Sequence, residues 1–343
     1  MANLTLDDMA KLANVSAKTI SRVVNNLPGV GPKKRAEIEK LIEETGFRPN
    51  FGARVLASSR SYIICMIVFE QTSHYYFSEL QIGISRACIA AGYHLIVEPV
   101  GAVIDQGKQA IERRFAALRP DGFIVVPPVS EALPFLEDLK ALNYPFVRVA
   151  PVADKDMSSF VEMDDERAVY EITSQLIGQG HRDLAWISVG RNLASMPVRE
   201  AGFRRAMGEA GIPIRADLMV VPQPETSYGH EEAFAMLSRP DRPTAIVGGN
   251  DSVALAAIAA AQRAGLMVPK DVSVVGFDDS PGSESCWPPM TTVHQPIAEL
   301  GQKATEILLR HLDRDQPITG YRNVKVDFDI VYRASSGPRP AKG

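Results

Sequence analysis

The 343-residue chain has few cysteines, namely Cys65, Cys88 and Cys286. They show no spacing typical of metal ligands, and an odd number favours a reducing compartment, because secreted domains use cysteines in pairs. The N-terminal residues include Asp7 and Asp8 and lack a long apolar run, so we expect no signal peptide. Apolar stretches such as residues 63–69 are too short to span a bilayer. These absences predict a cytoplasmic protein that does not enter the membrane.

Motifs for common enzyme chemistry are also missing. The sequence has no G-x-G-x-x-G dinucleotide motif, no phosphate-binding P-loop, no G-x-S-x-G nucleophile motif and no metal-ligand spacing among its six histidines. His181 follows a glycine turn and precedes a predicted strand, which is typical of a structural role. We therefore expect neither a cofactor nor a metal.

The charge of the chain is divided unevenly. Residues 1–60 contain ten Lys or Arg and six Asp or Glu, so this segment carries +4, whereas the whole chain carries −4 and the remainder therefore −8. A hydrophobic content of 45% with 23% charged residues is typical of a globular protein long enough for more than one domain. The asymmetry predicts a head that binds a polyanion, attached to an acidic body.

Residues 16–25 have the pattern of a short amphipathic helix. Ile20, Val23 and Val24 fall at helical spacing and can face a small core. Ser16 can cap the first turn by accepting a hydrogen bond from a free backbone N–H. The side chains that then face outwards are small, polar or basic: Ala17, Lys18, Ser21, Arg22 and Asn25.

A second helix is predicted directly upstream, over residues 4–13, with Thr5 and Asp8 at the spacing of a capping box. Only Asn14 and Val15 remain for the turn, and asparagine tolerates the left-handed backbone that a tight corner needs. Two helices, a short turn and an exposed basic face are typical of a helix-turn-helix. An ordinary helical hairpin has the same periodicity, but the positive charge of the segment argues against it.

A third helix is predicted over residues 33–45, and Gly46 ends it. We therefore expect a three-helix domain over residues 1–49. Residues 50–60 follow as a linker, whose segment 51–58 is too short to be a stable helix alone and is expected to order when a partner packs on it.

From residue 61 the sequence alternates between apolar runs and amphipathic helices. Strands are expected at 63–69, 94–98, 122–126, 146–149, 184–189, 245–247 and 272–277. Helices are expected at 77–90, 108–118, 131–142, 166–177, 197–210, 230–237, 252–264 and 297–310. Continuous apolar strands that alternate with helices indicate parallel sheets covered on both faces.

This part is too long for one open sheet, so we expect two α/β subdomains over residues 61–337, with a crossing near 153–165 and a disordered tail over 338–343. Ligands of such sheets bind beyond the carboxyl ends of the strands. The walls of a cleft between two facing subdomains would therefore be formed by the residues that come directly after Phe69, Val126, Val189, Gly248 and Phe277 in the sequence.

Several short stretches together carry a family resemblance. They are residues 6–10 (LDDMA), 15–16 (VS), 19–25 (TISRVVN), 46–50 (GFRPN), 178–181 (GQGH), 199–203 (REAGF), 250–251 (ND), 274–279 (VVGFDD) and 289–293 (PMTTV). In this order and spacing they make the chain similar, along essentially its whole length, to the lactose-repressor (LacI/GalR) family of bacterial transcription regulators.

The resemblance implies a homodimer whose second helices enter successive major grooves of a pseudo-palindromic DNA operator. Ala17, Lys18 and Arg22 would then read base edges, since Arg and Lys suit guanine and Ala can contact a thymine methyl group. Five other side chains would mostly contact phosphates: Thr5, Ser16, Thr19, Ser21 and Asn25. In the linker, the DNA-binding residues would be Arg54 and Leu56, with the leucine as a wedge in the minor groove. The alternative for Leu56 is a core position in the linker.

The resemblance also implies a periplasmic-binding-protein-like body of two doubly wound parallel-sheet subdomains, with a small-molecule effector between them. A sugar or sugar derivative is expected, because amides, carboxylates and Arg can bind hydroxyl groups while an aromatic covers the ring. The effector-binding residues would be Tyr76, Phe77, Asp164, Asp165, Arg199, Asn250 and Asp278. Each has a structural alternative: the aspartates could brace loops, the arginine could pair with a neighbouring helix, and the aromatics could be core.

The first functional hypothesis is an effector-controlled transcription regulator, most readily a repressor. The second hypothesis is a solute-binding protein for transport, which could use the same two-subdomain body. The basic head would then have no function. The third hypothesis is an enzyme, but the sequence contains none of the enzyme motifs named above. The identity of the effector, the operator sequence and the sign of regulation stay open. Dimer and tetramer also stay open, although no heptad repeat follows Tyr332.

Overall fold

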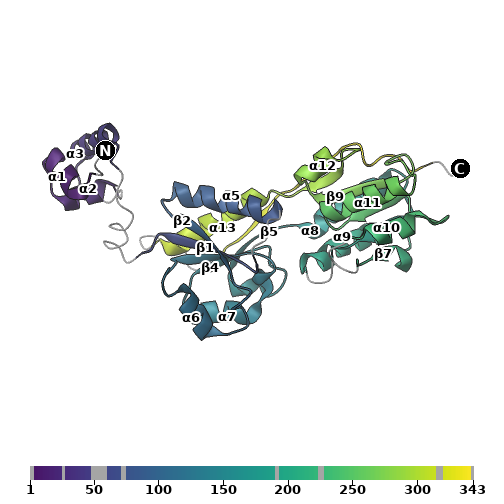
Figure 1. Ribbon diagram of the computed structural model, residues 1–343, viewed down its shortest axis with the longest axis horizontal. Coiled ribbons are helices and arrows are strands. Elements are labelled where there is room, and N and C mark those ends of the chain that lie inside the picture. The colour runs from purple at the N-terminus through teal and green to yellow at the C-terminus, as the bar shows by residue number, and fades with distance from the viewer. Residues whose placement is uncertain are drawn as a thin grey trace. The chain divides into compact units, whose positions relative to one another are not determined.

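The computed structural model of the protein describes residues 4–24, 28–47, 60–70, 75–189, 193–222, 228–313 and 320–340. The chain divides into two compact units, Met1–Tyr62 and Ile63–Gly343, which we call the head and the body. Figure 1 shows the labelled elements of both units. Three expected DNA-binding residues lie outside the described residues, together with the expected hinge: Asn25, Arg54 and Leu56.

The head contains α1 (Leu6–Ala13), α2 (Ala17–Val24) and α3 (Pro32–Thr45). The three predicted helices are thus confirmed. Their apolar faces meet in one small core, which is built from Met9, Ala10, Ile20, Val23, Ile38 and Phe47. Since this core takes the inner face of α2, the polar residues of α2 stay at the surface of the head.

Local sequence signals fix both ends of α1. The Thr5 hydroxyl oxygen accepts a hydrogen bond of 3.2 Å from the Asp8 N–H, and the Asp8 carboxylate accepts one of 3.0 Å from the Thr5 N–H, which completes the predicted capping box. Asn14 ends the helix in the left-handed region at φ 51°, ψ 52°. The corner between α1 and α2 therefore follows directly from these residue types.

The body has two six-stranded sheets with the same strand order. The first lobe has the order β11-β5-β4-β3-β1-β2, from β1 (Ile63–Val68), β2 (His94–Pro99), β3 (Gly122–Val125), β4 (Phe146–Val149), β5 (Ser159–Met163) and β11 (Asn323–Val326). The second lobe has the order β12-β10-β9-β8-β6-β7, from β6 (Leu184–Ile187), β7 (Met219–Val220), β8 (Ala245–Gly248), β9 (Ser273–Asp278), β10 (Thr291–His294) and β12 (Asp329–Val331).

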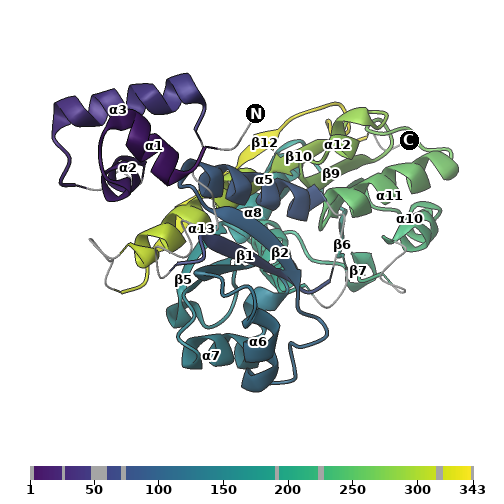
Figure 2. The same cartoon turned by 60° about the vertical axis from the view of Figure 1, so that its left-hand side comes forward.

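Helices cover both faces of the first sheet. Figures 1 and 2 show α5 (Tyr75–Ala90) and α13 (Ile297–Leu312) on one side of it, and α6 (Lys108–Phe115) and α7 (Leu133–Ala141) on the other. The two short helices η1 (Val129–Glu131) and η2 (Lys155–Met157) follow β3 and β4. Although α13 is late in the sequence, it packs against β3, β4 and β5, so the first lobe is completed by chain that returns from the second.

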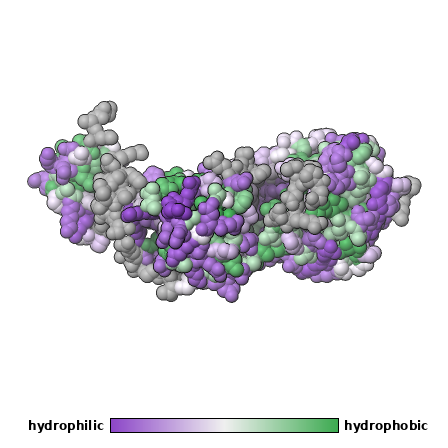
Figure 3. All heavy atoms as spheres, turned by 60° about the horizontal axis from the view of Figure 1, so that its bottom comes forward, coloured by the Kyte–Doolittle hydropathy of each residue, from purple (hydrophilic) through white to green (hydrophobic). Residues whose placement is uncertain are grey.

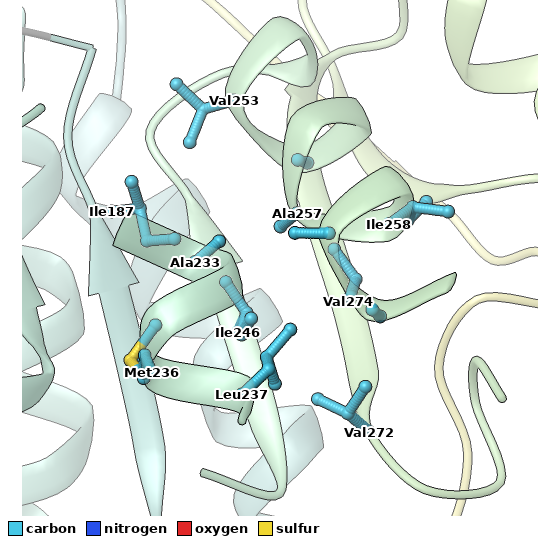
Figure 4. Packing of buried hydrophobic residues seen from close by; sticks show 14 of the residues in the cluster. Ile187, Ala233, Met236, Leu237, Ile246, Val253, Ala257, Ile258, Val272 and Val274 are labelled. Carbon is cyan, nitrogen blue, oxygen red and sulfur yellow. The ribbon is translucent and has the colours of Figure 1, made fainter. Parts of the chain in front are cut away.

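The second sheet is covered by α8 (Asp165–Gly178) and α9 (Ser195–Glu209), and by α10 (His230–Leu237) and α11 (Asp251–Arg263). Two short helices, η3 (Ala216–Leu218) and α12 (Pro281–Ser285), lie in its loops. In β6, Ala185 and Ile187 join the core with α10 and α11 (Figure 4), whereas Trp186 contacts Phe203 of α9, with ring centroids 5.9 Å apart. Successive side chains of a strand alternate between faces, which is why one apolar run supplies both cores.

The sequence predicts a crossing between the lobes near 153–165, and the chain crosses inside this segment, at its C-terminal end. Residues 155–157 form η2 and residues 159–163 form β5 in the first lobe, so the first crossing lies at Asp164, between β5 and α8. The strand was missed because polar residues such as Ser159 and Glu162 interrupt its apolar run. Within the described residues, further crossings lie between β10 and α13 and between β11 and β12.

Two other expectations need correction. The second sheet is not wholly parallel, because β12 pairs with β10 in the antiparallel sense. The expected disordered tail begins at residue 338, yet the Arg339 N–H donates to the Gln179 carbonyl at 3.0 Å, so Arg339 is held on the second lobe. Residues 341–343 lie outside the described part.

Polar and apolar residues are interspersed over the face of the protein shown in Figure 3. Among the described residues, none of the helices combines the length and the apolar character that a membrane span requires.

Candidate functional site

A cavity of about 540 Å³ in the body is lined by residues of both lobes. It lies beyond the carboxyl ends of five strands, where its lining includes Glu70, Pro127, Val189, Asn250 and Asp278. In each lobe the first and third strands are neighbours whose connections leave towards opposite faces, and such switch points are where open parallel sheets bind ligands. The expected positions of the cleft walls are therefore confirmed.

The structure brings six of the seven expected effector-binding residues to this cavity: Tyr76, Phe77, Asp165, Arg199, Asn250 and Asp278. Asp164 is not among the lining residues. Its carboxylate caps α8 by accepting a hydrogen bond of 3.1 Å from the Arg167 N–H, and it pairs with Lys325 Nζ at 2.9 Å. The N-cap position directs this side chain to the first turn of its own helix, so the neighbouring carboxylate of Asp165 faces the cavity instead.

Arg199 projects from α9 and is only 7% exposed. Its Nε donates to Asp165 Oδ1 at 2.6 Å, and its Nη1 donates to the Gly249 carbonyl at 2.8 Å. The guanidinium carbon lies 3.5 Å from the centroid of the Phe277 ring. These contacts hold the planar fork in one orientation, which suits it to donate to ligand oxygens with little loss of side-chain entropy.

Asn250 is held by the start of α11. Its Oδ1 accepts a hydrogen bond of 3.0 Å from the Val253 N–H and so caps the helix. Asp251 follows and is buried: its carboxylate accepts from the Thr292 hydroxyl at 2.6 Å and from the Ser280 N–H at 2.6 Å. Burial raises the pKa of Asp251 despite these donors. Asp251 therefore fixes α11 against β10 and places Asn250 at the cavity.

Asp278 ends β9 with φ 125°, a backbone conformation that favours glycine. Gln295 Nε2 donates to its Oδ1 at 2.5 Å. Burial raises the pKa of Asp278 to about 7; the charge of Arg199 opposes this rise and that of Asp251 adds to it. A carboxyl group that titrates near neutral pH inside a cavity can either donate or accept a hydrogen bond.

The next residue, Asp279, braces its loop. Its Oδ1 accepts from Arg333 Nη2 at 2.7 Å, and its Oδ2 lies 3.0 Å from His294 Nδ1. Burial would raise the pKa of Asp279, but the bond to Arg333 outweighs it and the pKa lies below its usual value. These two contacts hold the loop after β9 to β10 and to the segment after β12.

The wall from the first lobe is mainly apolar and aromatic. Tyr76 and Phe77, at the start of α5, are in edge-to-face contact with ring centroids 5.7 Å apart. Burial raises the pKa of Tyr76, which keeps its hydroxyl protonated. Further apolar lining comes from Phe69, Pro127, Pro128, Pro151 and Val152. The same wall also carries four charged residues, namely Glu70, Glu131, Lys155 and Glu162, beside its aromatic and apolar surface.

Sequence reasoning missed Gln295, because the strand before it, β10, was not predicted. It also missed Asp251, although the Asn-Asp pair after a predicted strand was a usable signal. Tyr75 lies one residue before the expected aromatic pair and also lines the cavity. Among the described residues, no cluster of His, Cys, Asp and Glu could hold a metal ion.

In the head, the expected DNA-binding residues gather on and around α2. Lys18 is exposed, Ala17, Thr19, Ser21 and Arg22 are half-buried, and Ser16 caps the helix, with its hydroxyl 3.2 Å from the Thr19 N–H. The hydroxyl of Thr5 is engaged in the cap of α1. The arrangement presents one basic and polar helix face on a small apolar core.

Known proteins match both units. Residues 5–50 match the model of bacterial regulatory proteins of the lacI family, and residues 173–336 match that of a periplasmic binding protein-like domain. The HTH-type transcriptional repressor PurR of Vibrio parahaemolyticus is 33% identical over 309 residues, which cover 90% of this chain and 92% of that protein.

Two solved structures resemble the whole fold or the body. The lac repressor dimer bound to operator and the anti-inducer ONPF gives a TM-score of 0.76 at 26% identity, with 98% of this chain and all of that chain covered. A LacI family regulator from Enterococcus faecium with bound ribose gives 0.68 at 25% identity, with 80% of this chain and 99% of that chain covered.

A helix-turn-helix head joined to a two-lobed body with a cavity between the sheets defines a DNA-binding transcription regulator with a ligand-binding domain. The sequence identity of 33% to this PurR, over nine tenths of the chain, and the match of residues 5–50 to the lacI model identify the family. The chain belongs to the LacI family of bacterial regulatory proteins.

Proposed function

We propose that this protein is a repressor that binds a pseudo-palindromic DNA operator as a homodimer and is controlled by a sugar or sugar derivative held between its lobes. The observation that carries the proposal is the 540 Å³ cavity, with Arg199, Asn250 and Asp278 on one side and Tyr76 and Phe77 on the other. Fixed polar groups that face an aromatic wall match the hydroxyls and the apolar ring face of a sugar.

The DNA-binding part of the proposal is supported by α2. Its exposed Lys18 can donate to guanine, and Arg22 lies one turn further along the same helix. The lac repressor, whose fold this chain shares, is a dimer bound to operator in the solved structure. A symmetric dimer would present two copies of α2 to the two half-sites of a pseudo-palindrome.

The sugar part is supported by the rigid donors and acceptors of the second lobe. Arg199 is held by Asp165 and Gly249, and Asp278 by Gln295, so a ligand meets groups that are already oriented. The family member from Enterococcus faecium holds ribose. We infer a binding rather than a catalytic role, in the cytoplasm where a regulator meets its DNA.

Control of DNA binding requires that the effector prefer one arrangement of the two lobes, because a ligand shifts an equilibrium only by its differential affinity for the two states. The cavity takes groups from both lobes, so a ligand that touches both walls is sensitive to the angle between them. We expect such a ligand to alter the spacing of the two heads in the dimer and to release the operator.

To test this proposal, DNA duplexes that bind the protein are selected from a random pool, and their affinity is measured by mobility shift. We expect Lys18→Ala to weaken binding by about tenfold or more, since a base contact is worth about 1–3 kcal/mol. Lys40→Ala is the matched control: this exposed lysine of α3 pairs with Glu44, and its loss should change affinity little.

The complex of protein and DNA is then titrated with D-ribose, D-glucose, D-galactose and cellobiose. Failure of every duplex to shift at low salt would exclude a DNA-binding repressor, and failure of the four sugars to act would count against a sugar effector.

A further inference from the structure

Arg148 lies in the middle of β4 and is 1% exposed, an unusual place for an arginine. Its guanidinium donates to four oxygens of nearby loops: Ser158 Oγ at 3.0 Å, the Ser130 carbonyl at 3.2 Å, the Ala153 carbonyl at 3.1 Å and the Asp154 carbonyl at 2.5 Å. These acceptors belong to the loop after β3 and the loop after β4. One buried side chain therefore joins two loops that are separate in sequence.

Glu131 joins the same two loops from the other side. It ends η1, after β3, and its Oε1 accepts from the Val152 N–H at 2.7 Å while its Oε2 accepts from the Ala153 N–H at 3.1 Å. Arg148 thus binds carbonyl groups of residues 150–154, and Glu131 binds N–H groups of the same segment. Together they bind backbone groups of this segment, of which the Asp154 carbonyl also accepts from the Met157 N–H of η2 at 3.0 Å.

The backbone of this segment needs such support. Ala150 has φ 46° and Asp154 has φ 48°, both in the left-handed region that favours glycine. Residues other than glycine keep this conformation only where the surrounding structure enforces it, and such positions gather at ligand sites. Arg148 holds Asp154 by binding its carbonyl, while Ala150 is held by its own N–H, which donates to the Val161 carbonyl of β5 at 2.7 Å.

The two loops also form the first-lobe wall of the cavity. Pro127 and Pro128 come from the loop after β3, and Ala150, Pro151 and Val152 from the loop after β4. Arg148 itself is not among the lining residues. The contacts of Arg148 therefore act on the cavity through the loops alone, whereas Glu131 is half-buried and also lines the cavity.

We propose that Arg148 and Glu131 are positioning residues for the effector: they lock the segment 150–154 against the loop after β3, so that its apolar residues form a wall at a fixed distance from Arg199 and Asp278. The proposal rests on the proposed function, in that the cavity binds a small molecule. It adds that effector affinity depends on Arg148, a buried side chain outside the cavity, and on Glu131, a half-buried lining residue whose two carboxylate oxygens are taken by the Val152 and Ala153 N–H groups.

The test uses full-length Arg148→Lys, Arg148→Met and Glu131→Gln proteins. Arg215→Met is the matched control, because Arg215 also joins two segments, through Asp217 and the Asp241 carbonyl, but does not line the cavity. Hydrogen exchange is measured over residues 126–132, 150–158 and 250–264. Titration calorimetry measures affinity for D-ribose, D-glucose, D-galactose and cellobiose, and mobility shift measures operator affinity without sugar.

We expect exchange over 150–158 to rise by about tenfold or more in Arg148→Met, with 250–264 unchanged. Sugar affinity should fall by about tenfold or more, as it does when supporting residues around a site are removed, while operator affinity stays within about twofold. Arg148→Lys and Glu131→Gln should show the same changes to a smaller extent, and Arg215→Met neither. If Arg148→Met does not fold, the milder variants decide.

Unchanged sugar affinity in variants whose loops exchange faster would overturn the proposal, as would unchanged exchange. An equal loss of sugar and operator affinity would indicate a merely structural role and would also overturn it. If none of the four sugars binds the wild-type protein, the sugar effector fails while the positioning role is still decided by exchange: a rise confined to 126–132 and 150–158 supports it, and a rise spread over the body contradicts it.

Discussion

The two lobes of the body share a strand order but build opposite walls of one cavity. In both, the loop after the fourth strand is left-handed and held by an arginine: Ala150 and Arg148 in the first lobe, Asp279 and Arg333 in the second. The second-lobe loop presents Asp278 to the cavity, whereas the first-lobe loop presents small and apolar residues. The same strand order therefore places different side chains beyond the strand ends: a carboxylate held by Gln295 on the second-lobe wall, and small apolar residues after β4 on the first-lobe wall.

The largest effects are expected where each lobe packs two helices through glycine. A Cβ at Gly83 of α5 would overlap the Ala298 carbonyl of α13, and a Cβ at Gly202 of α9 would overlap the Glu166 carbonyl of α8. Backbone must shift in either case, so Gly83→Ala and Gly202→Ala should each lower the free energy of unfolding by about 3 kcal/mol, at the upper end of overpacking effects. Denaturant unfolding measures the change.

Gly208→Ala is the control for both variants, because Gly208 also lies in α9 and a Cβ there meets nothing within 4 Å. This change should stabilise the protein by about 0.5–1 kcal/mol, as expected for alanine in a helix interior. A loss in Gly208→Ala comparable to that in Gly202→Ala would show that helix propensity, not close packing, governs these positions.

The second prediction compares the two walls directly. Arg199→Met removes the donor that Asp165 and Gly249 hold, and leaves a carboxylate in the cavity without its partner. We expect the sugar concentration that releases the operator to rise by about a hundredfold, which corresponds to about 2.7 kcal/mol. Tyr76→Leu keeps apolar surface and should cost only about tenfold. Mobility-shift titration measures both, and a larger effect of Tyr76→Leu would reverse the assignment of roles to the walls.

Most of the fold could be predicted because the core strands of both lobes are continuous apolar runs. Those runs gave β1, β4 and β9 to within a residue or so at each end. Two of the strands were missed for different reasons: the apolar run of β5 is interrupted by Ser159 and Glu162, and β11 alternates polar and apolar residues at the edge of its sheet. Which sheet a strand joins depends on contacts far along the chain, and local periodicity does not contain them.

The site could be predicted as far as strand ends determine it. Arg199, Asn250 and Asp278 follow from their places after predicted strands and in the family motifs. The choice between Asp164 and Asp165 could not be made from periodicity, because it depends on which carboxylate caps α8. Arg148 was missed, although a single charged residue within the apolar run FVRV was a visible signal.

The third prediction uses the raised pKa of Asp278, a carboxyl group on the second-lobe wall. Its folded pKa is about 7 and its ordinary value 3.8, so the folded state binds the proton more tightly. This residue's contribution therefore makes the free energy of unfolding fall as pH rises from about 4 to 7. Asp278→Asn removes the titration and should gain stability relative to wild type by about 1 kcal/mol between pH 5 and 8, after allowance for solvent access to the cavity. Thermal unfolding across this range measures the difference, and a constant difference would contradict the shifted pKa.

The smallest predicted effect concerns stability in the loops after β4 and β9. It distinguishes the contribution of the backbone conformation from that of the side chain. Ala150→Gly should stabilise the protein by about 0.5 kcal/mol, because relief of the left-handed strain exceeds the extra freedom that glycine gives the unfolded chain. Asp279→Gly relieves a similar φ of 55° but removes the acceptor for Arg333 and His294, so it should destabilise instead. Denaturant unfolding of the two variants gives the signs. Opposite signs would show that the first-lobe loop is held by other residues and the second-lobe loop by its own side chain, and equal signs would remove that distinction.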